Sequence, residues 1–261
     1  MHLTAVVLIA LGGLCYCLVA LRRLFVLRLV NNVAERPWLV WIGMALHSVG
    51  LVVSLIDHEH PDFAHAVLGS WAALASLLFL TRFLASPSRG LLVLPVGGMV
   101  LLLAVAGLAV KPRDPVDGHT SVIVVVHILF MTFQLAAAVL AGASAFVYLL
   151  AVKQLKAAQA GTFTLPNLSK LDHLFERSLV LSTALLIGGL ATGGAAMRVS
   201  GTFSLAHPAS VLSLINMGVL ILSFSLRLAG RLGRRGLAVS ALASMAIAAI
   251  ATASLIVNRH G

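Results

Sequence analysis

The sequence predicts an all-α polytopic membrane protein, a bundle of eight transmembrane helices with the N-terminus and the C-terminus both outside. Of its 261 residues, 60% are hydrophobic and only 10% are charged, which leaves too much apolar surface for a soluble domain. A helix that crosses about 30 Å of hydrocarbon needs roughly 20 apolar residues. Eight stretches qualify, near residues 3–21, 38–56, 65–83, 91–110, 121–150, 178–197, 208–226 and 237–257. Residues 1–261 are therefore predicted to form a single integral membrane domain.

The distribution of basic residues predicts the orientation of this bundle. Most Lys and Arg fall in the connections on one side: Arg22, Arg23, Arg28, Arg36, Arg82, Arg89, Lys153, Lys156, Lys170, Arg177, Arg227, Arg231, Arg234 and Arg235. The opposite side holds only Lys111, Arg113, Arg198 and Arg259. Since short loops rich in Lys and Arg stay cytoplasmic, we expect a multi-pass protein of the bacterial inner membrane. The net charge of +10 then reflects orientation, with the lipid bilayer and not nucleic acid as partner.

The longest basic connection, from about residue 151 to 177, carries a helical pattern of its own. Leu168, Leu171, Leu174 and Phe175 follow helical spacing, and Ser169 with Asp172 suits a capping box. The pattern predicts a short amphipathic helix on the inner surface that leads into the sixth span. A simple connector is the alternative.

Motifs for soluble chemistry, including phosphate-binding glycine loops and nucleophile elbows, are absent from the sequence, so no catalytic constellation is expected. The informative residues are histidines. His47 falls in the middle of the second predicted span, where an ionisable group is costly unless it faces the bundle interior. Gly43, Gly50 and Ser54 share its helical face, which is small and polar enough to admit a neighbouring helix or a flat ligand. The alternative is a structural histidine held by an interhelical hydrogen bond.

His127 and His260 form the second candidate. His127 lies about two turns into the fifth predicted span from the outer side, with Gln134 on the same face, and His260 follows the eighth span on that same side. Two neutral imidazoles from different helices at one membrane depth are what a bis-histidine haem iron requires. The sequence is therefore compatible with an outer haem site.

Several loose motifs resemble those of the cytochrome c assembly (CcsA-like) family of membrane proteins. The resemblance covers about residues 40–261 and rests on the runs His127-Ile128-Leu129-Phe130, Ala143-Phe146-Tyr148, Leu165-Pro166, Leu171-Asp172-His173-Leu174, Leu185-Leu186-Ile187-Gly188, Ala191-Thr192-Gly193 and Gly233-Arg234-Arg235-Gly236. The family has a tryptophan-rich haem loop, whereas the segment 198–210 of this chain contains no Trp. This difference favours the short, eight-span HemX- and YpjD-like branch.

The resemblance implies a haem-handling protein related to cytochrome c biogenesis, which binds or delivers haem through histidines. By position in the family, His127 matches the first outer ligand, His260 the second, and His47 a histidine of the membrane site. The weaker candidates are His207 as an extra ligand and, for the haem propionates, Lys111, Arg113, Arg198 and Arg259. Other cytochrome c assembly proteins are the partners that the resemblance implies.

Three other readings remain open. One loop has the ligand types for Zn or Cu, namely Asp57, His58, Glu59, His60 and the nearby His65. The chain could instead be a cofactor-free accessory or regulatory protein that acts through helix contacts, since Gly189 and Gly193 form a GxxxG motif. A small-molecule transporter is the third reading, but acidic residues are nearly absent from the predicted spans.

Overall fold

A computed structural model describes residues 1–29, 38–57, 61–81, 89–109, 122–156, 168–200 and 207–258. The described chain forms eight α-helices: α1 (His2–Leu29), α2 (Trp38–Ile56), α3 (Pro61–Thr81), α4 (Arg89–Leu108), α5 (Val122–Lys156), α6 (Leu168–Ser200), α7 (Pro208–Leu228) and α8 (Arg234–Asn258). Every predicted span therefore corresponds to one helix.

The helices have the length and composition of membrane spans. Seven of them, all except α3, are long and apolar enough to cross a membrane, while α3 contributes the shorter apolar segment Phe63–Leu78. An apolar helix satisfies its backbone hydrogen bonds internally and can therefore cross hydrocarbon. The protein is thus a polytopic all-α membrane protein, as the composition predicts.

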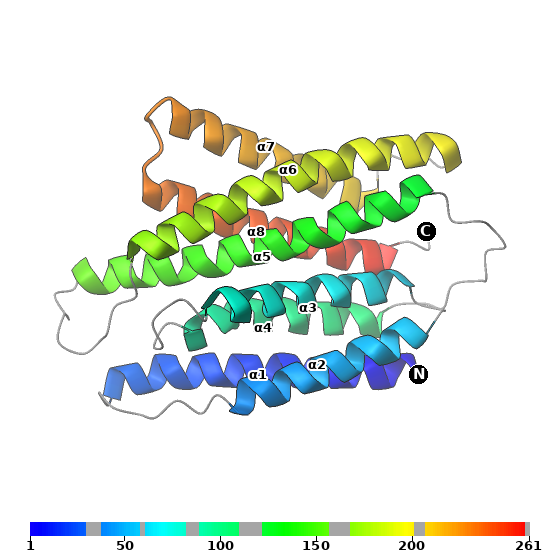
Figure 1. Cartoon of the computed structure of the whole chain (residues 1–261), viewed down its shortest axis with the longest axis horizontal. Helices are drawn as coiled ribbons and strands as arrows, with labels where there is room; N and C mark the ends of the chain where they lie inside the picture. Colours follow the sequence, from blue (N-terminus) through cyan, green and yellow to red (C-terminus); the bar gives the residue numbers. More distant parts are fainter. Residues whose placement is uncertain are drawn as a thin grey trace.

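Successive helices run in alternating directions, so α1 begins and α8 ends at the same end of the bundle (Figure 1). We call this the histidine end, because it carries His2, His65, His127 and His207. The opposite end, called the basic end, carries the exposed residues Lys153, Lys156, Lys170, Arg231, Arg234 and Arg235. Apart from His173, which lies on α6 at the basic end, the described histidines near the helix ends and the exposed basic residues are on opposite sides of the bundle.

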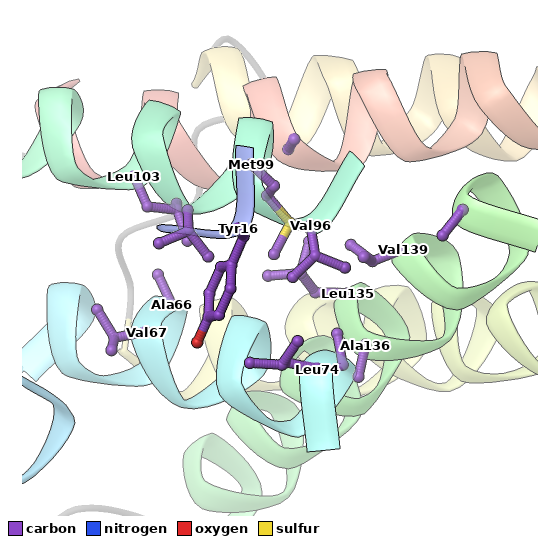
Figure 2. Packing of buried hydrophobic residues seen from close by; sticks show 14 of the residues in the cluster. Tyr16, Ala66, Val67, Leu74, Val96, Met99, Leu103, Leu135, Ala136 and Val139 are labelled. Carbon is purple, nitrogen blue, oxygen red and sulfur yellow. The ribbon is translucent and has the colours of Figure 1, made fainter. Parts of the chain in front are cut away.

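The bundle has two packing regions that share α5. The larger buried cluster joins α1 through α5 with parts of α6 and α8, and Figure 2 shows Tyr16 at its centre among side chains of α3, α4 and α5. The smaller cluster lies between α5, α6, α7 and α8, around Phe175, Leu186 and Leu220. Of the two main histidine candidates, His47 lies beside Tyr16 of the larger cluster, whereas His127 lies between α5 and α6, against Gly189 and Gly193.

Glycines bring α1 and α2 unusually close together. A Cβ built on Gly43 of α2 would lie 2.6 Å from Cε1 of Tyr16, and one built on Gly50 would lie 2.7 Å from Cγ1 of Ile9. The predicted face of α2, with Gly43, His47, Gly50 and Ser54, is buried. That prediction is confirmed, and the face is occupied by a neighbouring helix, α1.

The predicted helix near residues 168–175 is confirmed as a helix that leads into the sixth span, but its placement on the membrane surface is wrong, because it forms the first two turns of the continuous helix α6. Leu171 and Phe175 are fully buried, and the Phe175 ring packs 5.4 Å from the ring of Tyr148 on α5. At about 1.5 Å per residue, the 35-residue α5 exceeds the thickness of the hydrocarbon layer. Helices α5 and α6 therefore both continue past the predicted spans. The apolar residues at the start of α6, such as Phe175, pack against α5 and not against the membrane surface.

Candidate functional site

His47 is completely buried between α1, α2 and α3. Its Nε2 lies 3.1 Å from the hydroxyl oxygen of Ser70 on α3, and that hydroxyl donates to the carbonyl oxygen of Val67 at 2.8 Å. Since the serine proton is used in this second bond, Nε2–H of His47 is the donor to Ser70. The arrangement fixes the tautomer and leaves the lone pair of the imidazole on Nδ1.

The surroundings of His47 are those of an interhelical contact. Its ring lies 6.2 Å from that of Tyr16, and a Cβ built on Gly12 of α1 would lie 3.4 Å from the Cβ of His47. One residue further along α2, the Ser48 hydroxyl accepts a hydrogen bond of 2.9 Å from Nε1 of Trp71 on α3. Two adjacent residues of α2 thus bond to two adjacent residues of α3, which locks the register of these helices.

His127 has a different environment. It is half-buried on α5 near the histidine end, and its Nδ1 lies 2.9 Å from the carbonyl oxygen of Gly189 on α6. A carbonyl oxygen only accepts, so Nδ1–H is the donor and the neutral ring carries its lone pair on Nε2. A histidine that ligates a metal usually donates its other N–H to a carboxylate, backbone carbonyl or water, and the His127 ring has this arrangement.

Three glycines of α6 make room for this side of α5. A Cβ built on Gly193 would lie 2.8 Å from Cε1 of His127, and the corresponding positions at Gly188 and Gly189 would meet Phe130 and Met131. Gly194, by contrast, has open space around it. The Gly189–Gly193 motif is thus used for packing within the chain, where it also exposes the carbonyl group that orients His127.

The packing of α5 against α8 relates His127 to the end of α8. Gly142 of α5 packs directly against Met245 of α8, and the two helices run in opposite directions (Figure 1). Asn258 lies 13 residues after Met245, and Leu129 lies 13 residues before Gly142. At an equal rise of about 1.5 Å per residue, the end of α8 reaches the depth of Leu129, two residues from His127.

His207 caps the start of α7. Its Nδ1 accepts a hydrogen bond of 3.3 Å from the backbone N–H of Ala209, so the ring proton is on Nε2. This Nε2 is buried and has no hydrogen-bond partner among the described residues. His207 therefore presents a donor, which suits an anionic group better than it suits iron.

The remaining candidates are only partly covered by the structure. His260, Arg259, Lys111, Arg113, His58, Glu59 and His60 lie outside the described residues, and Arg198 is described only as part of the α6 backbone. Asp57 is buried, with its carboxylate 3.9 Å from Nδ1 of His2, while His65 is half-buried on α3. Within the described ranges, no three His, Cys, Asp or Glu side chains come together to hold a metal ion.

Sequence reasoning missed the partners that fix each histidine. Ser70 lies 23 residues from His47, and the carbonyl of Gly189 lies 62 residues from His127. The sequence predicted the buried helical face of His47 and the close packing at the GxxxG motif, but not the residue that each one contacts. Those contacts became visible only in the packing of the helices.

The fold defines a multi-pass α-helical membrane protein. No protein-family model, no curated protein and no solved structure matches the chain.

Proposed function

We propose that this protein binds haem at the histidine end through His127 and handles haem in a process related to cytochrome c biogenesis. The observation that carries the proposal is the hydrogen bond from Nδ1 of His127 to the carbonyl oxygen of Gly189. It holds the ring in one orientation and one tautomer, with Nε2 as the nitrogen that can ligate iron. Haem would supply a redox-active iron, which His127 would hold through Nε2.

The depth of the end of α8 supports His260 as the second axial ligand in this proposal. Asn258, the last described residue of α8, is level with Leu129 of α5 by the register of the Gly142–Met245 contact. His260 follows two residues later in the sequence. His127 of α5 and His260, which follows α8 in the sequence, would then hold the haem between them, as in haem sites built between the helices of a bundle.

Two other histidines have different roles in the proposal. The Nε2–H of His207, at the start of α7, suits a haem propionate as a hydrogen-bond acceptor. His47 is packed against α1 and bonded to Ser70, so we assign it to the stability of the α1–α2–α3 contact. The proposed site therefore involves only the helices α5, α6, α7 and α8.

The cellular setting follows from the same proposal. We place the protein in the bacterial inner membrane with eight spans and both termini outside, because basic residues are kept on the cytoplasmic side. Haem would then be bound on the outer side, where other cytochrome c assembly proteins could receive it. No catalytic constellation is assigned, and the role is binding or delivery.

Absorption spectroscopy of the protein purified in detergent from haem-replete cells tests the proposal. We expect the wild type to show a Soret band and, after reduction, α and β bands typical of six-coordinate haem. His127→Ala should lose this signal, while His173→Ala should keep it, because His173 is exposed on α6 at the basic end. A folded wild type that stays colourless when haem is added would overturn the proposal and favour a cofactor-free accessory protein.

A further inference from the structure

Four arginines lie in and beside the ordered turn between α7 and α8 at the basic end: Arg227 in the last turn of α7, Arg231 in the connection, and Arg234 and Arg235 at the start of α8. The backbone N–H groups of Arg231 and Leu232 both donate to the carbonyl oxygen of Leu226, at 2.9 and 3.0 Å. Gly230 adopts a left-handed conformation with φ of 69°, which a glycine takes without strain. These bonds fix the turn, so its arginines project from a defined backbone. We call Arg227, Arg231, Arg234 and Arg235 the basic corner.

The charge of the basic corner is only partly compensated within the protein. Nη1 of Arg234 lies 2.7 Å from the carboxylate of Asp172, a buried residue in the first turns of α6. Arg231 and Arg235 are exposed and make no ion pair with any described residue. The basic corner therefore has positive charge that an external anion can neutralise.

Apolar side chains lie directly beside these charges. Leu228, at the end of α7, is 89% exposed, and Ile221 and Leu222 on the same helix are also exposed. A cluster of guanidinium groups suits phosphate oxygens, which accept paired hydrogen bonds from arginine. Exposed leucine and isoleucine side chains suit acyl chains. A phospholipid of the surrounding bilayer combines both chemistries in one molecule, with its phosphate at the level of the arginines and its acyl chains beside the membrane-spanning helix α7.

We infer that the basic corner is a binding site for an anionic phospholipid, with the phosphate group held by Arg231 and Arg235 and the acyl chains along the outer face of α7. Arg234 is a positioning residue, since its bond to Asp172 joins the turn to α6. The site is independent of the proposed haem site, which lies at the opposite end of the bundle (Figure 1).

Native mass spectrometry of the full chain tests this inference. The protein is released from detergent micelles that contain equal amounts of phosphatidylglycerol and phosphatidylcholine, and the retained lipid is measured. We expect selective retention of phosphatidylglycerol by the wild type. Arg231→Gln combined with Arg235→Gln should weaken that selectivity roughly thirtyfold, because each basic residue near a membrane surface adds to the attraction for anionic lipid.

The matched control is Lys153→Gln combined with Lys156→Gln, which removes the same charge from exposed positions of α5 at the same end. This control should keep the selectivity, and both double variants should unfold at the wild-type temperature. Equal losses in the two double variants would show general attraction to the charged end and overturn the site. Displacement of the lipid by an equal concentration of sodium phosphate would overturn it in favour of a simple anion site.

Discussion

His47 and His127 are both histidines on apolar helices, but they are held in opposite ways. His47 is fully buried and donates Nε2–H to the Ser70 hydroxyl, with α1 packed against its helix through Gly43. His127 is half-buried near one end of the bundle and donates Nδ1–H to a backbone carbonyl. The first arrangement closes a helix contact, whereas the second orients a ring in the way seen for many metal-ligating histidines, which is the basis of our haem proposal. Membrane depth alone does not distinguish a functional histidine from a structural one.

The largest expected effect in this comparison concerns the ring of His127 itself. His127→Gly should abolish the haem absorption signal, because it removes the nitrogen that we propose as the iron ligand. Imidazole added at millimolar concentration should restore a six-coordinate spectrum, since the free ring can occupy the same space between α5 and α6. The spectrum of the purified variant is recorded with and without imidazole. His47→Gly serves as control and should keep its spectrum without any imidazole.

A methyl group on Gly193 should disturb the same site without removing a ligand. The added Cβ would lie 2.8 Å from Cε1 of His127, so the ring must move and its bond to Gly189 must lengthen. We expect Gly193→Ala to weaken haem binding about tenfold, since overpacking typically costs about 1–3 kcal/mol. Haem titration measures the effect. Gly194→Ala is the matched control, because nothing lies within 4 Å of that position, and equal losses in both variants would refute the geometric cause.

A glycine-to-alanine substitution in the His47 region should lower the stability of the protein and leave haem binding intact. In Gly43→Ala the new Cβ would lie 2.6 Å from Cε1 of the buried Tyr16. We expect a loss of about 1–2 kcal/mol in the free energy of unfolding, after the better helix propensity of alanine is included. Thermal unfolding in detergent reports it. Gly98→Ala, where the Cβ would meet open space, should be neutral or stabilising; an equal loss there would contradict the account.

The smallest effect is expected at the hydrogen bond between α2 and α3. Ser70→Ala removes the acceptor of Nε2–H of His47 and should lower the free energy of unfolding by about 1 kcal/mol. Ser76→Ala, at an exposed position of the same helix, is the control for the loss of a hydroxyl group. A Ser70→Ala protein that lost haem while remaining folded would show that the two regions are coupled.

The sequence predicted the parts of this fold that depend on local composition. The span 38–56 coincides with α2, and the shared face of Gly43, His47, Gly50 and Ser54 is buried. The lengths of α5 and α6 were not predicted, because contacts such as that between Tyr148 and Phe175 continue these helices past their apolar windows. Likewise, the group that orients His127 is the backbone carbonyl of Gly189. Any residue at position 189 would supply a backbone carbonyl. Such a partner leaves no signature in the sequence, apart from the small residues that allow the helices to approach.

A parallel haem titration of the wild type, His47→Ala and His127→Ala, all purified without haem and shown to be folded, tests the central claim most directly. The account predicts that the wild type and His47→Ala bind one haem per chain with similar affinity and that His127→Ala does not form the six-coordinate species. Loss of binding in His47→Ala with retention in His127→Ala would contradict it, because the ligand would then belong to the region that we assign to helix packing.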